Sequence, residues 1–269
     1  DAERARFVPP ARVLHRSDHE VVVATPDGPP RLTEEANRTL SGIVQPVRVR
    51  LTPIPGPATV VTTPVRSGRE ANPAVNLMLA ELTEANFMST WQTLEDFVTR
   101  YTLAPENVLA TGWIRDQFLS FGLDAEFHLY WQDGTRRNVV ATLPGMLDPE
   151  RVVYLTAHLD SRSGTPLVCA PGADDDASGV AVLLELARTW HEQGYVPRQT
   201  VLFAAWDAEE EGLLGSTHYV LHPRYPLQDT VAMVQFDMVG AGGDTLWIDG
   251  EGELGQHLRA VAEALGIET

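Results

Sequence analysis

Eight polar residues of this sequence, seven acids and one histidine, have types and spacings that suit metal-dependent hydrolysis. They are His158, Asp160, Asp174, Asp175, Asp176, Glu209, Glu210 and Asp237. Carboxylates that gather at one place repel one another unless positive charge lies among them, and one histidine supplies too little. Oxygen and imidazole ligands without thiolate suit zinc in a catalytic site, with manganese or cobalt as substitutes. The sequence therefore predicts a site for one or two divalent cations.

The spacing within this set indicates different roles for its members. His158 and Asp160 stand at positions i and i+2, so in an extended strand they project from the same face. Asp160 is then placed to accept a hydrogen bond from the second ring N–H of His158 and to orient the ring. Of the adjacent acids Glu209 and Glu210, one can bind a metal while the other takes a proton from the attacking water.

Short apolar runs must bring these residues together. Runs over 152–157, 200–206 and 231–236 alternate with helical patterns over 180–190 and 213–221. Such alternation predicts parallel strands that are buried on both faces and joined by right-handed crossovers. Each run ends at one of the polar segments, and the carboxyl ends of parallel strands share the sheet edge where open α/β folds build ligand sites. We expect an α/β fold with a mostly parallel central sheet flanked by helices on both faces.

The rest of the chain divides into an extension and the start of the same domain. Residues 1–72 contain short valine-rich pieces such as 21–23 and 47–51 between Pro-Gly breaks, which predicts an N-terminal extension of short strands and turns. Residues 73–269 are expected to form a catalytic domain. Its further elements are predicted as helices over 75–84, 89–101, 106–121 and 254–265 and strands near 125–132 and 138–143.

Composition excludes several other classes of function. The formal net charge is -17, and no basic run exceeds Arg136-Arg137, which argues against binding to nucleic acid. Cys169 is the only cysteine, so neither an internal disulfide nor a thiolate zinc cluster can form. No apolar stretch approaches the roughly 18 residues that a membrane span needs. Neither nucleic acid nor a membrane is expected as a partner.

Four segments that contain the polar set together resemble a known family. In order they are AHLDS at 157–161, APGADDDASG at 170–179, AEEEGLLGS at 208–216 and QFDM at 235–238. This looks like the co-catalytic dinuclear zinc aminopeptidases of the bacterial leucyl aminopeptidase type, in metallopeptidase clan MH. The resemblance covers roughly residues 85–269, and it implies the zinc exopeptidase fold.

The resemblance implies a ligand set for two zinc ions. Asp175 would bridge both ions, His158 and Asp237 would complete the protein ligands of one, and Glu210 would bind the other. It also implies a cis peptide bond between Asp175 and Asp176.

The same resemblance implies a mechanism and a substrate. Glu209 would be the general base that activates a metal-bridging water, and Asp160 would orient His158. The implied activity is hydrolysis of the N-terminal peptide bond of peptides with a free N-terminus. The family resemblance also favours a secreted or periplasmic location.

The sequence departs from the family at its last ligand. That ligand is a histidine in a Ser-Asp-His type motif, which has no counterpart before Thr269, and His257 in the expected last helix is a poor substitute. We therefore expect a domain that is incomplete at its C-terminus and completed by a further segment of the same protein. In this chain the metal held by Asp175 and Glu210 is expected to be weakly bound or absent.

Three other interpretations stay open. The segment 198–210 also resembles the glutamate carboxypeptidase and transferrin receptor branch of the clan, which predicts a carboxypeptidase. A single-zinc glutaminyl cyclase fits less well, because that branch lacks the DDASG continuation found at 175–179. The third is a non-catalytic domain that binds peptides or partner proteins through the same cleft. Metal content and peptidase turnover discriminate between this last interpretation and the enzymes.

Overall fold

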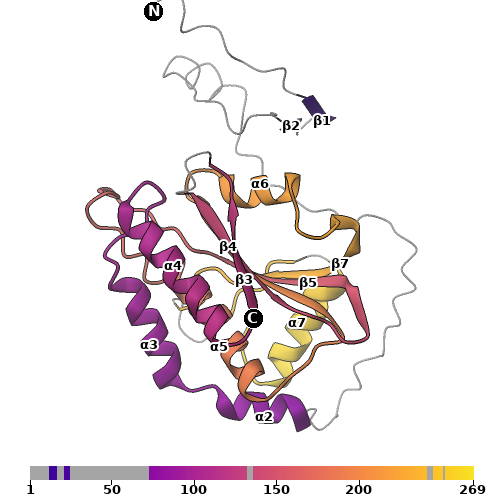
Figure 1. Ribbon diagram of the computed structural model, residues 1–269. Helices are drawn as coiled ribbons and strands as arrows, with labels where there is room; N and C mark the ends of the chain where they lie inside the picture. Colours follow the sequence, from indigo (N-terminus) through magenta and orange to yellow (C-terminus); the bar gives the residue numbers. More distant parts are fainter. Residues whose placement is uncertain (1–11, 17–20, 25–72, 132–135, 241–244, 251) are drawn as a thin grey trace, which may run out of the picture.

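A five-stranded mixed sheet forms the centre of the molecule in the computed structural model, which describes residues 12–16, 21–24, 73–131, 136–240, 245–250 and 252–269 (Figure 1). Its strands are β3 (Asp124–Leu129), β4 (Arg137–Leu143), β5 (Asp148–His158), β6 (Gln199–Trp206) and β7 (Thr230–Gln235), in the order β3-β4-β6-β5-β7. β5 is parallel to β6 and β7, whereas β4 is antiparallel to β3 and β6. Only β4 therefore opposes the common direction, and the predicted mostly parallel sheet is confirmed.

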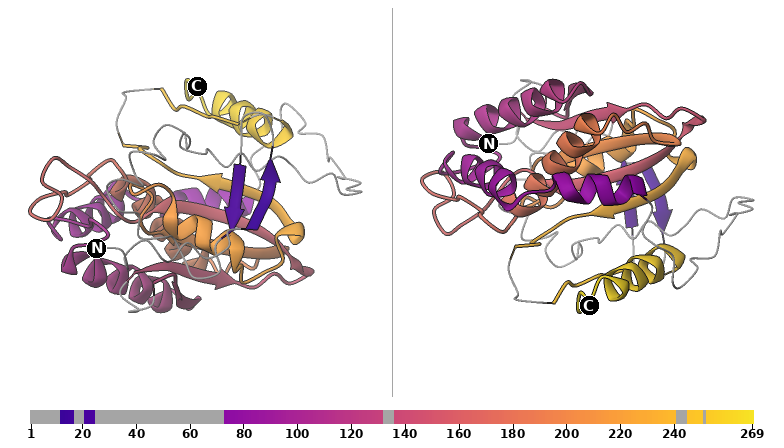
Figure 2. Two further views of the ribbon diagram at one scale, coloured as in Figure 1. Left: turned by 90° about the horizontal axis from the view of Figure 1, so that it is seen from above. Right: turned by 90° about the horizontal axis from the view of Figure 1, so that it is seen from below.

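Helices cover both faces of this sheet. They are α2 (Pro73–Glu81), α3 (Glu84–Glu95), α4 (Pro105–Ser120), α5 (Ala177–Glu192), α6 (Leu214–Leu221) and α7 (Glu253–Ala264), with a short 3-10 turn η1 (Leu227–Asp229). One core cluster joins α3, α4 and α5 to one sheet face, and a second packs Tyr219 of α6 on the other. Figure 2 shows α7 on the side of the molecule opposite α3 and α4. The prediction of helices on both faces is confirmed.

The two central strands are buried as their apolar sequences predict. In β6 every residue after Gln199 is buried, including Leu202 and Phe203, and β5 is buried at its carboxyl end. The prediction that 231–236 is also buried on both faces is wrong. In the described structure β7 pairs only with β5 and forms the sheet edge, so Val231 and Met233 are 44% and 39% exposed.

Helix boundaries differ from the predicted ones where capping and backbone reversal decide them. The helix expected over 89–101 begins earlier, because the Thr83 side chain accepts a hydrogen bond from the Asn86 N–H at 3.2 Å and caps α3. It also ends earlier, at Glu95, and Val98 then has a left-handed φ of 66°. After this change of direction the chain brings Arg100 to the segment that follows β5, where its guanidinium group donates to the Leu159 carbonyl oxygen.

The N-terminal part of the chain contains one described pair of strands. β1 (Arg12–Arg16) pairs antiparallel with β2 (Val21–Ala24), so the predicted strand at 21–23 is confirmed. The predicted piece at 47–51 lies outside the described residues, and the domain boundary at residue 72 stays a prediction. Among the described residues no helix is long and apolar enough to cross a membrane.

Three imidazole rings lie together where α6 meets β3. The ring centroid of His218 is 4.3 Å from that of His222 and 5.3 Å from that of His128. Burial lowers the pKa of His218 to about 4, and the neighbouring His222 and His128 add to this effect. Burial likewise lowers the pKa of His128. His128 and His218 are therefore favoured in their uncharged forms.

This cluster predicts a loss of stability in acid. The His218 pKa is about 4 in the folded chain against an ordinary 6.5, so between these values the unfolded chain binds more protons. The contribution of uncharged His218 to the free energy of unfolding is therefore complete above pH 6.5 and is lost as the pH falls toward 4. Because buried acids such as Asp207 titrate with the opposite sign, the informative quantity is the difference between the wild type and His218→Phe. We expect the wild-type melting temperature to fall more steeply than that of the variant between about pH 7 and 4.5, and parallel curves would contradict this.

Candidate metal centre

The carboxyl ends of β5 and β7 and the turn before α5 bring three of the predicted ligands together. His158 ends β5, Asp237 follows β7, and Asp175 lies just before α5. Each offers one ligand atom, and these atoms all lie within 4.8 Å of one another. His158 Nε2 is 2.8 Å from Asp175 Oδ1 and 3.8 Å from Asp237 Oδ1. The imidazole is almost fully buried, whereas the two carboxylates are close to half exposed and accessible to solvent.

Asp160 connects this group to the two glutamates that follow β6. Its side chain is fully buried, and its Oδ1 lies 3.5 Å from His158 Nδ1, which is long for a hydrogen bond. Asp160 Oδ1 also accepts the Glu209 N–H at 2.9 Å, and Oδ2 accepts the Glu210 N–H at 3.3 Å. Asp160 thus fixes the backbone of both glutamates and lies beside the imidazole. The Glu210 carboxylate is not part of the close three-residue group.

The electrostatics of the site are those of acids with too little positive charge. Burial disfavours protonation of His158, but the carboxylates of Asp160 and Asp175 outweigh it and raise the imidazole pKa to about 11. Burial raises the pKa of Glu210 to about 7, and the Asp175 charge adds to the shift. Burial also raises the pKa of Asp237, with Asp175 again contributing. These acids resist ionisation because they are partly buried and because their negative charges repel one another.

Asp176 has a structural position next to the predicted bridging acid. It is fully buried, its Oδ1 accepts the Gly179 N–H at 2.8 Å as the N-cap of α5, and its Oδ2 accepts the His158 N–H at 3.1 Å. The peptide bond between Asp175 and Asp176 is cis, as the resemblance implied. Asp176 therefore ties the start of α5 to the end of β5 while Asp175 faces the site.

A second tie holds the segment after Asp237. The Gly240 N–H donates to Asp174 Oδ1 at 2.7 Å, and the Val239 N–H donates to Ser178 Oγ at 3.0 Å. Ser178 Oγ in turn donates to the Asp174 carbonyl oxygen at 2.7 Å. These bonds fix the chain that leaves β7 against the start of α5, and so place Asp237.

Two residues beside the site acids have left-handed backbone. Ala208, directly before Glu209, has φ 55°, and Met238, directly after Asp237, has φ 52°. Such conformations cost on the order of 1–3 kcal/mol for residues other than glycine, and they concentrate at functional sites. Here they turn the chain sharply at the ends of β6 and β7, so that the acids lie at the sheet edge.

Sequence reasoning missed the one buried cation behind these acids in the described structure. Arg100 is fully buried, and it donates to the carbonyl oxygens of Leu159 at 2.9 Å, Leu94 at 3.1 Å and Gly172 at 3.0 Å, and also to that of Pro171. Burial lowers its pKa to about 10, against the charges of Asp176 and Asp160. No spacing in the sequence distinguishes Arg100 from a surface arginine.

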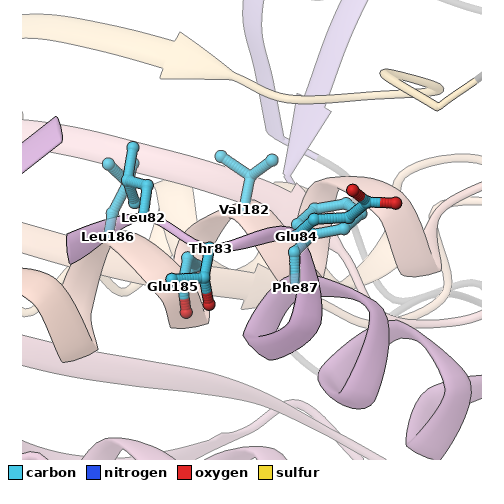
Figure 3. A pocket seen from close by; sticks show the side chains of 7 residues that line it. All are labelled: Leu82, Thr83, Glu84, Phe87, Val182, Glu185 and Leu186. Carbon is cyan, nitrogen blue, oxygen red and sulfur yellow. The ribbon is translucent and has the colours of Figure 1, made fainter. Parts of the chain in front are cut away.

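Two cavities of the described structure lie away from this centre. The one in Figure 3, of about 300 Å³, lies between the start of α3 and the outer side of α5. Its walls include Leu82, Phe87 and Leu186 together with parts of Glu84 and Glu185, and the lining is mostly apolar. None of the predicted site residues lines this cavity. The half-exposed carboxylates of Asp175 and Asp237 show that the candidate metal centre is open to solvent.

The residues at this edge fit a divalent cation. One imidazole nitrogen and two carboxylate oxygens already face one another, and they match the donors that zinc takes in catalytic sites. A cation there would also relieve the repulsion that raises the pKa values of Glu210 and Asp237. The geometry therefore agrees with the predicted ligands His158, Asp175 and Asp237, whose binding role stays a prediction.

Comparison with known proteins identifies zinc-dependent peptidases as relatives of this chain. Residues 138–268 match the family model described as peptidase family M28. A probable zinc metalloprotease of Pyrenophora teres f. teres (strain 0-1) is 35% identical over 188 residues, which cover 61% of this chain and 40% of that protein. The chain spans less than half the length of the curated relatives that it matches.

Solved structures agree on the fold. The LapA aminopeptidase of Legionella pneumophila superposes with a TM-score of 0.62 at 21% identity, over 74% of this chain and 57% of that one. A glutaminyl cyclase of Porphyromonas gingivalis superposes with a TM-score of 0.57 at 26% identity, over 69% of this chain and 72% of that one. Together with the sheet order and the acids at its edge, the match over residues 138–268 makes this part of the chain similar to peptidase family M28.

Proposed function

We propose that the protein is a zinc-dependent aminopeptidase that hydrolyses the N-terminal peptide bond of peptides. The observation that carries the proposal is the buried His158, which faces Asp175 and Asp237 at the sheet edge where Asp160 fixes the Glu209 and Glu210 backbone. His158, Asp175 and Asp237 would hold one zinc ion, and Asp175 with Glu210 would contribute to a second. A bound zinc ion lowers the pKa of a water molecule and polarises the carbonyl group of the substrate.

Glu209 has the properties of a general base, which is the role that the family resemblance implies for it. Burial raises the pKa of its carboxyl, and the negative charges of Asp160 and Asp237 add to the shift, so the carboxylate is a stronger base than an exposed one. The Glu209 main chain is fixed by its hydrogen bond to Asp160. Its side chain is not one of the three that form the close ligand group, so it is free to act on a proton. Glu209 would take a proton from the attacking water and deliver it to the leaving amine.

Two observations support a substrate with a free N-terminus. Glu209 and Glu210 lie beside the ligands Asp175 and Asp237, and together these acids exceed the charge of one zinc ion and leave negative charge for an α-ammonium group. The LapA structure, which shares the fold, is that of an aminopeptidase. The same charges disfavour the free C-terminal carboxylate that a carboxypeptidase must bind.

Peptides that differ only at their ends test this assignment. We expect leucine p-nitroanilide to be hydrolysed by the zinc-loaded protein and its N-acetylated form to resist. Hydrolysis of the blocked substrate, or of a C-terminal residue, would favour the carboxypeptidase interpretation. Because the P. gingivalis structure is that of a glutaminyl cyclase, a peptide with N-terminal glutamine is the third substrate, and ring closure in place of peptide cleavage would overturn the proposal.

Zinc is expected to stabilise the folded chain measurably. A ligand that binds only the folded state at about 100 times its Kd adds about 2.7 kcal/mol. We therefore expect the metal-free chain to melt at a higher temperature after zinc is added, and Asp237→Ala to lose most of that gain. Asp229→Asn, which changes an acid outside the site, serves as the control. Equal gains in both variants would show that zinc binds elsewhere, and elemental analysis gives the number of ions per chain.

A further inference from the structure

We propose that Asn138 is a positioning residue for the site, because its side chain clamps both ends of the loop that carries Glu209 and Glu210. The catalytic part of this inference rests on the proposed function, whereas the clamp itself is a matter of structure. The loop in question runs over residues 207–215, from the end of β6 to the first turn of α6, and is called the glutamate loop below.

The clamp consists of two hydrogen bonds from one buried amide. Asn138 lies in β4 and is fully buried. Its Oδ1 accepts the N–H of Asp207 at 2.9 Å, and its Nδ2 donates to the carbonyl oxygen of Gly215 at 2.9 Å. The first and last residues of the glutamate loop are therefore held by one side chain from a neighbouring strand. The Gly215 N–H also donates to the Asp207 carbonyl oxygen at 3.1 Å and closes the loop base.

The orientation of this amide follows from its main-chain partners. The Asp207 N–H can only donate and the Gly215 carbonyl can only accept, so the oxygen and nitrogen of Asn138 cannot be exchanged. The remaining Asn138 N–H points to His128 Nδ1 at 3.2 Å, which must accept. His128 Nε2 then carries the proton and donates to the His222 carbonyl oxygen at 3.1 Å. Both N–H groups and the oxygen of the Asn138 amide therefore have hydrogen-bond partners, and uncharged His128 is one of them.

The space around the clamp admits little change. A Cβ atom on Gly215 would overlap both Asn138 Oδ1 and the carbonyl oxygen of Asp207. The Asp207 carboxylate is fully buried and accepts hydrogen bonds from Thr102 at 3.1 Å, Asn107 at 3.0 Å and Tyr130 at 2.9 Å. The loop base is thus fixed on all sides by directional bonds, and Asn138 is the member that reaches both of its ends.

The middle of the glutamate loop has a different anchor. Asp160 accepts the N–H groups of Glu209 and Glu210, and the left-handed Ala208 lies between that anchor and Asp207. Without Asn138 the loop base loses its two side-chain hydrogen bonds to β4, and the turn at Ala208 loses part of its support. The structure therefore assigns Asn138 a role in directing Glu209, at a distance from the reacting atoms.

The test compares Asn138→Ala and Asn138→Asp with Val140→Ala. Asn138→Asp keeps an acceptor for the Asp207 N–H but places an oxygen against the Gly215 carbonyl. Val140 is two residues further along β4 and equally buried, so its truncation lowers stability without touching the loop. Three quantities are measured on zinc-loaded protein: deuterium uptake of residues 207–215, zinc content, and kcat and KM for leucine p-nitroanilide.

We expect both Asn138 variants to take up deuterium faster over 207–215 and to lose about tenfold or more in kcat while KM changes little. Val140→Ala should show neither change at a comparable melting temperature. Asn138 variants that match Val140→Ala in uptake and kcat would overturn the positioning role. Absence of turnover in the wild type would instead refute the proposed function, and the uptake comparison would still decide whether Asn138 clamps the loop.

Discussion

Replacement of Glu209 by glutamine is expected to lower kcat by about 10²–10⁴-fold while zinc stays bound. The amide has nearly the same shape as the carboxylate but cannot take a proton, so only the base function is removed. The Glu209 N–H, which donates to Asp160 at 2.9 Å, is unchanged by the substitution. Steady-state hydrolysis of leucine p-nitroanilide gives kcat, and elemental analysis gives the zinc content of the same samples.

Glu211 supplies the control for this experiment. It is the third acid of the same run, and its Oε1 accepts a hydrogen bond from Arg162 at 3.1 Å, outside the close ligand group. We expect Glu211→Gln to retain turnover. Undiminished hydrolysis in Glu209→Gln would show that another group takes the proton, and loss of zinc from that variant would show that Glu209 is a ligand.

Replacement of Arg100 by leucine is expected to lower the free energy of unfolding by about 3–5 kcal/mol. The guanidinium group is fully buried and satisfies carbonyl oxygens of Leu94, Leu159 and Gly172. Leucine leaves these acceptors without donors and removes the guanidinium charge near Asp160 and Asp176. Urea denaturation of the metal-free chain measures the change without interference from zinc.

Arg115 provides a matched arginine on the surface. It pairs with Asp116 at 2.5 Å, and both side chains are substantially exposed. We expect Arg115→Leu to change the free energy of unfolding by less than about 1 kcal/mol. A loss of similar size in the two variants would mean that the carbonyl bonds of Arg100 contribute no more than a surface ion pair.

The sheet edge and its acids could be predicted from sequence because their signals are local. A buried strand that ends at His158, or at Asp237, is visible as an apolar run followed by a polar residue. The parallel arrangement then requires these ends to meet, and the structure brings His158, Asp175 and Asp237 together. Glu209 and Glu210 follow from the same argument, although their roles in binding and catalysis stay predictions.

The supporting residues could not be predicted because their partners are distant in the chain. Asn138 reads as an ordinary residue at the start of a strand, yet it bonds residues 69 and 77 positions away. Arg100 likewise reaches carbonyl groups up to 72 positions away. Such contacts leave no periodicity, so composition and spacing cannot reveal them. The exposure of β7 depends on which strands pair with it. The sequence of the strand itself does not contain that information.

The wide separation of the ligands along the chain has a consequence for biosynthesis. A ribosome that has completed β5 and α5 has produced His158 and Asp175, but Glu209, Glu210 and Asp237 are added later. The Arg100 anchor also requires α3, β5 and the segment before α5 to be in place at once. Contacts of such high contact order form late in folding. A nascent or partly folded chain therefore has no complete site, and the proposed peptidase activity would require the folded polypeptide.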